Sequence, residues 1–207
     1  DTAPVIMESA LPPGSPNRIW GGILYVGNFA EGNVEHVVLR HAEIGVQVRR
    51  GIIAEQSAGG DTTGTVPEYI QQRATGPVRI RACTIDSASF NGIVLVGIDS
   101  TVVVEGNLIE NCSSGISCED GSTPYLRNNR IINNTSTGII CSSNSSPVIE
   151  NTTIIGSTTA GIICADNSNP IIDGCVIAKN GIGLSVTKSS PRISRCTIAR
   201  NDFSGII

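Results

Sequence analysis

A short motif, glycine followed by isoleucine, recurs along most of this 207-residue chain at nearly constant spacing. Its copies begin at Gly92, Gly115, Gly138, Gly161 and Gly205, and a glycine-leucine pair at Gly183 fills the one missing place. Successive copies are 23, 23, 23, 22 and 22 residues apart. Such a period indicates an array of repeats, each of which is one supersecondary unit that cannot bury its apolar face alone.

Each repeat contains three apolar columns separated by turn residues. The columns are Ile80, Val104, Leu126, Ile149, Ile172 and Ile193; then Ile85, Ile109, Ile131, Ile154, Ile177 and Ile198; then Ile93, Ile116, Ile139, Ile162, Leu184 and Ile206. Gly and Asn recur between the first two columns, where a left-handed bend would turn the chain. Three short strands per 21–24 residues predict an all-β parallel solenoid of about eight coils, with like side chains stacked inside.

The composition agrees with a narrow stacked core. The chain has 30 isoleucines but only seven aromatic residues, and its 18 acidic residues outnumber its 14 basic ones. That balance gives no reason to expect nucleic acid, which calls for a basic surface. No apolar run approaches the ~18 residues of a transmembrane span, so we expect no membrane insertion.

The repeat pattern resembles the right-handed parallel β-helix superfamily, which includes pectate lyases, polygalacturonases and many bacterial surface proteins. The resemblance covers nearly the whole chain, and the stretch from Trp20 to Ile23 is similar to the opening coil of bacterial extracellular β-helix domains. It implies a right-handed helix in a secreted or cell-surface protein. It does not by itself imply a function, because one fold supports many activities.

One place breaks the period, because Gly45 and Gly92 are 47 residues apart. The excess falls in residues 51–76, which are rich in Gly, Thr and Ser. We interpret this segment as a loop that protrudes from a single β-helix domain spanning residues 1–207; a degenerate extra coil is the alternative. The domain could also be part of a longer solenoid.

Catalysis on this fold requires charged side chains on an outward face. The outward column of the third strands reads Leu24, Gln47, Val94, Ser117, Ile140, Ile163, Ser185 and Ile207, without a carboxylate. The polygalacturonase signatures (Asn-Thr-Asp, Asp-Asp, Gly-His-Gly and Arg-Ile-Lys) are absent, as is the calcium-binding aspartate cluster of the pectate lyases. These observations favour a non-catalytic protein with no metal and no cofactor.

The alternative is a polysaccharide-active enzyme, either a lyase, a hydrolase or an epimerase. Its site would use the 51–76 loop, where Asp61, Glu68 and Arg73 lie, together with the only two histidines, His36 and His41. Carboxylates and imidazoles are the usual general acids and bases of such reactions. The two histidines share one early coil, but no cysteine or carboxylate lies beside them at an obvious metal-ligand spacing.

A second charged column precedes the bend between the first two strands. It reads Glu35, Arg81, Glu105, Arg127, Glu150, Asp173 and Ser194. Charges of opposite sign alternate over the four coils from Arg81 to Glu150, and stacked coils lie about 4.8 Å apart. We therefore predict an ion-pair ladder that fixes the register of the coils and has a structural role.

The seven cysteines fall mostly in stacked positions. Cys118, Cys141 and Cys164 share one inward column, Cys83, Cys175 and Cys196 share another, and Cys112 lies outside both. We expect buried free thiols that act as small apolar side chains; a disulfide between stacked coils is the sterically conceivable alternative. A zinc site needs ligands that converge from different directions, which one stack does not provide.

Four outward aliphatic residues suggest an interface. Val94, Ile140, Ile163 and Ile207 lie in the third outward column, and exposed apolar rows invite a partner or a cover. We also expect bare coil ends to stack head to tail into filaments. The favoured hypothesis is a structural, adhesive or carbohydrate-contacting module whose partners are itself, end to end or side by side, or a polysaccharide.

Overall fold

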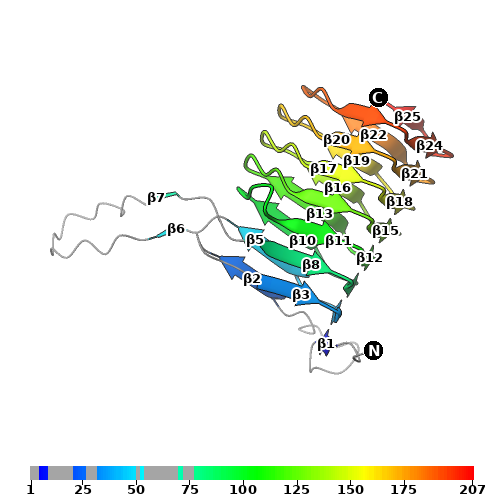
Figure 1. Cartoon of the computed structure of the whole chain (residues 1–207). Coiled ribbons are helices and arrows are strands. Elements are labelled where there is room, and N and C mark those ends of the chain that lie inside the picture. Colours follow the sequence, from blue (N-terminus) through cyan, green and yellow to red (C-terminus); the bar gives the residue numbers. More distant parts are fainter. Residues whose placement is uncertain (1–4, 9–20, 27–31, 50–51, 54–69, 72–76) are drawn as a thin grey trace, which may run out of the picture.

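The computed structural model describes residues 5–8, 21–26, 32–49, 52–53, 70–71 and 77–207. These residues form a stack of coils that follow one another along a single axis, from β1 and β2 at one end to β25 at the other (Figure 1). Seven complete coils carry three strands each, and all pairs between coils are parallel. The predicted all-β parallel solenoid is confirmed.

The strands form three sheets, called here sheets I, II and III in the order in which a coil visits them. Sheet I contains β3 (Gly32–Glu35), β8 (Val78–Arg81), β11 (Val103–Glu105), β14 (Tyr125–Arg127), β17 (Val148–Glu150), β20 (Ile171–Asp173) and β23 (Arg192–Ser194). Sheet II contains β1 (Val5–Glu8), β4 (Val37–Arg40), β9 (Thr84–Asp86), β12 (Leu108–Glu110), β15 (Arg130–Ile132), β18 (Thr153–Ile155), β21 (Val176–Ala178) and β24 (Thr197–Ala199). Sheet III contains β2 (Ile23–Val26), β5 (Val46–Arg49), β10 (Asn91–Val96), β13 (Ser114–Glu119), β16 (Thr137–Cys141), β19 (Ala160–Cys164), β22 (Ile182–Val186) and β25 (Ser204–Ile206). We number the complete coils 1 to 7, from β3–β5 to β23–β25.

Neighbouring coils stack in register, so each apolar column becomes a continuous row inside the solenoid. Ile109 pairs with Ile85 on one side and with Ile131 on the other. From Ile85 to Ile177 the members of this column are at most 1% exposed. Burying one such side chain contributes about 1.5–3 kcal/mol, so the stacked isoleucines supply much of the stability that a core of aromatic residues would otherwise provide.

The glycine of the Gly-Ile motif is required by close packing. A Cβ atom on Gly138 would lie 2.4 Å from Cγ2 of Ile154 and 2.5 Å from the carbonyl oxygen of Gly161 in the next coil. Any side chain here would push the coils apart. The same crowding at Gly115 and Gly161 explains why the motif recurs once per coil.

The predicted sharp bend between sheets I and II is present in every complete coil. Its central residues have φ between 46° and 64° and are His36, Ala82, Gly106, Asn128, Asn151, Gly174 and Arg195. Gly and Asn adopt this left-handed conformation most readily. The bend fixes the angle between the two sheets and therefore the direction in which their outer faces look.

The insertion leaves the solenoid between β5 and β8. Of residues 51–76, the structure describes only β6 (Ile52–Ile53) and β7 (Ile70–Gln71), which pair antiparallel. Around the insertion, β5 pairs directly with β10, β4 with β9 and β3 with β8. No coil therefore lies between coils 1 and 2, which rules out the degenerate extra coil.

Candidate functional site

The residues considered for catalysis do not form one site in the described part of the chain. Asp61, Glu68 and Arg73 lie outside the described residues. His36 and His41 lie at the two ends of β4, and both have a φ of 54°. Because a strand rises about 3.3 Å per residue, their backbones are about 16 Å apart. The two imidazoles are thus too far apart to share a metal ion or a proton.

The outer face of sheet III does not expose its aliphatic residues evenly. Val94 is only 4% exposed, whereas Ile207 is 58% exposed and Ile140 and Ile163 are half-buried. Val94 was expected to be exposed, and that expectation was wrong: the residue lies in register between Gln47 and Ser117. Ile140 and Ile163 pair with each other in register.

Charged groups are sparse on the same face. Within the described strands of sheet III, Glu119 is the one carboxylate and Arg49 the one cation. Val96 separates them in the register of the sheet, so their backbones are two coils, or about 10 Å, apart. Ser117 donates a hydrogen bond from Oγ to Oε1 of Glu119 at 2.6 Å. This carboxylate is therefore engaged by a hydroxyl group of its own strand.

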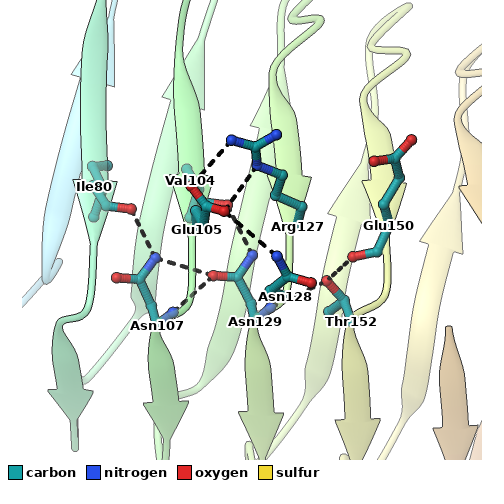
Figure 2. Close-up of polar contacts among 9 residues, drawn as sticks. All are labelled: Ile80, Val104, Glu105, Asn107, Arg127, Asn128, Asn129, Glu150 and Thr152. Atoms are coloured by element: carbon teal, nitrogen blue, oxygen red, sulfur yellow. Dashed lines mark hydrogen bonds and ion pairs between the residues drawn. The ribbon is translucent and has the colours of Figure 1, made fainter. Parts of the chain in front are cut away.

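The predicted charge ladder is present on the outer face of sheet I. Arg81 pairs with Glu35 through Nε–Oε1 and Nη2–Oε2 distances of 2.9 and 3.0 Å. Arg127 pairs in the same two-pronged way with Glu105 at 3.1 Å (Figure 2). Both arginines thus bind a carboxylate of the preceding coil. Arg127 makes this choice even though Glu150, its register partner in the following coil, is also acidic.

The ladder ends with an ion pair between Asp173 and Arg195. Arg195 donates to both carboxylate oxygens, and Ser194 donates to Oδ1 at 2.8 Å. The hydrogen bond from Arg195 is the main cause that lowers the pKa of Asp173 to about 2. The side chain of Arg195 is 79% exposed, so solvent screens this pair and its role is to align the coils.

Polar side chains inside the corners tie each coil to the next. In the corner between sheets I and II, the N–H of Asn107 donates to Oδ1 of Asn129 at 3.1 Å, and Nδ2 of Asn107 donates to the same oxygen at 3.0 Å. Nδ2 of Asn129 donates to the carbonyl of Val104 at 3.0 Å (Figure 2). These asparagines are 1% exposed, so each satisfies groups that water cannot reach.

The other two corners use the same arrangement. Between sheets III and I, the N–H groups of Ile98, Ser122, Ser145 and Ser168 donate to the Oγ atoms of Ser122, Ser145, Ser168 and Ser189. Between sheets II and III, Cys112 donates its N–H to Asn134, and Asn180 donates to Asn201. In each of these buried pairs the backbone donates toward the following coil, whereas the more exposed N–H groups of Asn169 and Ser190 donate toward the preceding coil.

All seven cysteines are free, as expected. Cys141 lies in register between Cys118 and Cys164 in sheet III. Cys112, which the sequence left outside the ladders, belongs to the corner column that contains Asn134. Burial raises the pKa of Cys112 and of Cys175 to about 11, so these thiols are protonated and poor nucleophiles near neutral pH.

The described residues contain no group of three or more His, Cys, Asp or Glu side chains that could hold a metal ion. Nor does this part of the chain include a helix long and apolar enough to cross a membrane. Many polar groups inside the corners thus bind neighbouring coils, and three ion pairs on the outside also join neighbouring coils.

Comparison with known proteins finds a matching family and several similar solved structures. The family described as a right handed beta helix region matches residues 69–207. The chain is similar to the enzymatically active domain of tailspike protein 2 from bacteriophage CBA120, with 15% identity and a TM-score of 0.47 over 91% of this chain and 35% of that one. Its similarity to QnrB1, a plasmid-mediated fluoroquinolone resistance protein, is lower, with 10% identity and a TM-score of 0.24 over 86% of this chain and 90% of that one. The comparison with curated proteins found no match.

Proposed function

The chain belongs to the right-handed parallel β-helix family, and on that premise we propose that it is a non-catalytic, rigid module of a secreted or cell-surface protein. Its role is to hold other parts at a fixed distance and to offer flat side faces for contact. Adhesion to a partner or to a polysaccharide surface fits such a module. The proposal concerns only the region within residues 1–207.

One observation carries this proposal: the polar and charged side chains are used to join coils. The corner asparagines and serines bind the backbone of the neighbouring coil, and the arginines of sheet I bind carboxylates of the preceding coil. A hydrolase or lyase instead needs charged groups that are free of such partners and converge on one substrate bond.

A polysaccharide panel tests the proposal directly. The full chain would be incubated with polygalacturonate, alginate and a neutral glucan, and both reducing ends and unsaturated products would be measured. We expect no release above that of the heat-denatured protein. Release by the native protein would overturn the proposal and favour the enzyme with Asp61, Glu68 and Arg73. Affinity electrophoresis through gels that contain the same polymers separates contact from catalysis.

A second form of contact, end-to-end stacking, is favoured by the surface of coil 7. Its inward side chains Ile193 and Ile206 are 38% and 51% exposed, while the matching Ile172 and Leu184 of coil 6 are fully buried. We propose that another coil covers this surface, with Asn, Ser, Thr or Cys at its corners to accept the free N–H groups. Light scattering and electron microscopy of the full chain test whether copies supply that coil by forming filaments; dispersed particles at high concentration would contradict it.

A further inference from the structure

The outer face of sheet II has no partner in the described structure, and its strands lie side by side along one side of the solenoid (Figure 1). Two columns of side chains point outward from coils 2 to 7. The first is Thr84, Leu108, Arg130, Thr153, Val176 and Thr197, and the second is Asp86, Glu110, Ile132, Ile155, Ala178 and Ala199. All twelve are at least partly exposed, while the residues between them face the core.

The charges on this face are separated along the axis. Asp86 and Glu110 are register neighbours in coils 2 and 3, although like charges repel. Lys179 and Arg200 directly follow the strands of coils 6 and 7 and stack on each other, with the N–H of Lys179 donating to the carbonyl of Ala199 at 3.3 Å. Arg40 of coil 1 is the register neighbour of Asp86 on its other side, and Asp86 also accepts hydrogen bonds from Ser87 and Asn111. The acidic pair of coils 2 and 3 thus lies next to Arg40, and coils 6 and 7 carry the cations Lys179 and Arg200.

The basic end is unusual in its backbone as well. Lys179 and Arg200 have a φ of 55°, at a corner position that Asn111, Asn133 and Gly156 occupy in coils 3 to 5. Long side chains are disfavoured there relative to Gly and Asn. The whole chain shows the same bias, since 17 of its 18 acidic residues but only nine of its 14 basic residues precede residue 179.

A two-fold axis between coils 4 and 5 makes this face complementary to itself. The axis places coil 2 opposite coil 7 of a second copy, coil 3 opposite coil 6, and coil 4 opposite coil 5. Glu110 then lies against the end of β21 that carries Lys179, and Asp86 against the end of β24 that carries Arg200. Ala178 and Ala199, the small residues directly opposite the two acids, leave room for the longer cations beside them.

The apolar residues match under the same operation. Ile132 of coil 4 faces Ile155 of coil 5, and Leu108 of coil 3 faces Val176 of coil 6, so aliphatic side chains meet at the centre. Among the other charges on the face, Arg130 lies opposite Thr153, and Arg40 of coil 1 lies beyond coil 7 of the second copy. At the margin, Phe90 and Phe203 occupy the same repeat position in coils 2 and 7 and are 57% and 83% exposed, so the axis brings each toward the other's copy.

We propose that sheet II is the interface of an antiparallel homodimer, in which two solenoids pack face to face with their axes reversed. Stacked sheets pack about 10 Å apart, and an interface with a two-fold axis uses the same patch on both copies. Each ion pair and each aliphatic contact then occurs twice. The ion pairs of such an interface are partly exposed and worth little each, so we expect a reversible dimer.

Charge exchange tests the interface on the full chain by sedimentation equilibrium at about 100 µM protein, where an interface of this size associates measurably. We expect dimers in low salt that dissociate in 1 M salt, because exposed ion pairs are screened. Glu110→Lys, which places a cation against Lys179 in both halves of the dimer, should weaken association about tenfold. Lys179→Glu should do the same, and the double variant should restore association.

Glu150→Lys is the matched control, since it makes the same change of charge on sheet I; it should leave the dimer intact. Circular dichroism of each variant confirms that the solenoid is folded. A monomeric wild-type protein at this concentration would overturn the proposal, as would a failure of the double variant to restore association, or equal weakening by the control. Because these readouts do not involve catalysis, they are independent of the polysaccharide test above.

Discussion

The corner ladder makes a strong prediction for Asn129→Ala. Oδ1 of Asn129 accepts from the N–H and from Nδ2 of Asn107, and its Nδ2 donates to the carbonyl of Val104. The substitution removes all three contacts at a place where Asn107 and Val104 are at most 1% exposed (Figure 2). No other side chain in the corner is long enough to replace them.

The magnitude follows from the number of groups left without a partner. Nδ2 of Asn107 keeps its hydrogen bond to the carbonyl of Ile80 at 2.9 Å, so the groups that lose these bonds are the N–H of Asn107 and the carbonyl of Val104. Each such buried group costs about 1–3 kcal/mol, so the free energy of unfolding should fall by about 2–6 kcal/mol. Asn129→Thr should cost less, because its hydroxyl resembles that of Thr152, which accepts from the N–H of Asn129 at 3.4 Å. Asn128→Gly is the matched control: it changes the exposed neighbour and keeps its left-handed backbone, with φ of 56°.

Urea unfolding followed by circular dichroism measures these differences as a shift in the midpoint. Because repeat arrays can unfold in parts, hydrogen exchange of the Asn107 amide provides a local readout. We expect Asn129→Ala to be the least stable protein, Asn129→Thr to be intermediate and the wild type to be the most stable. The backbone amide of Asn107 should exchange fast in the alanine variant. A loss below about 1 kcal/mol for Asn129→Ala, with slow exchange retained, would refute the ladder argument.

Three further predictions concern single groups. Nδ2 of Asn134 and Oγ of Ser157 have no partner in the described part of their corner column, so Ser157→Asn should complete the column and raise the free energy of unfolding by about 1 kcal/mol; an unchanged urea midpoint would count against it. Arg195 holds the pKa of Asp173 at about 2. The contribution of this pair to the free energy of unfolding is therefore complete above pH ~4 and is lost as the pH falls toward 2. In Arg195→Gln an NMR titration should show the pKa of Asp173 returning toward 3.8, and an unchanged pKa would exclude the pair. Six of the seven thiols are buried and Cys196 is half-buried. A thiol reagent at pH 8 should therefore modify Cys196 alone in the native protein and all seven cysteines after unfolding. Rapid reaction of Cys118 or Cys141 in the native protein would contradict this prediction and show that the coils open.

The sequence predicted the repeat core because stacking preserves residue type. An isoleucine that pairs in register with two isoleucines, as Ile109 does, must recur at a fixed interval, and the interval is visible in one sequence. The bends were predictable for the same reason, since a left-handed backbone selects Gly and Asn at Gly106 and Asn128. Repetition thus reveals whatever every coil must do in the same way.

Features that depend on the depth of a side chain or on the direction of a hydrogen bond could not be predicted in this way. Val94 alternates outward like Ile207, yet Val94 is 4% exposed and Ile207 is 58% exposed. Cys112 did not look like part of a ladder, because its column mixes Cys, Asn and Ser. Only the geometry shows that the backbone N–H groups of Cys112, Ser157 and Asn180 each donate to the side chain one coil further along the column. The self-complementary charges of sheet II were likewise hidden, since they depend on which outward residues share a face.

The most direct test of the central claim is the number of chain ends that the native protein releases from polygalacturonate and alginate. The claim is that the polar groups of this solenoid join its coils and leave no catalytic site. It predicts release equal to that of the heat-denatured protein, and equal release by a variant carrying Asp61→Asn, Glu68→Gln and Arg73→Gln. Release by the native protein that this triple variant abolishes would contradict the claim and would place an active site in the 51–76 segment.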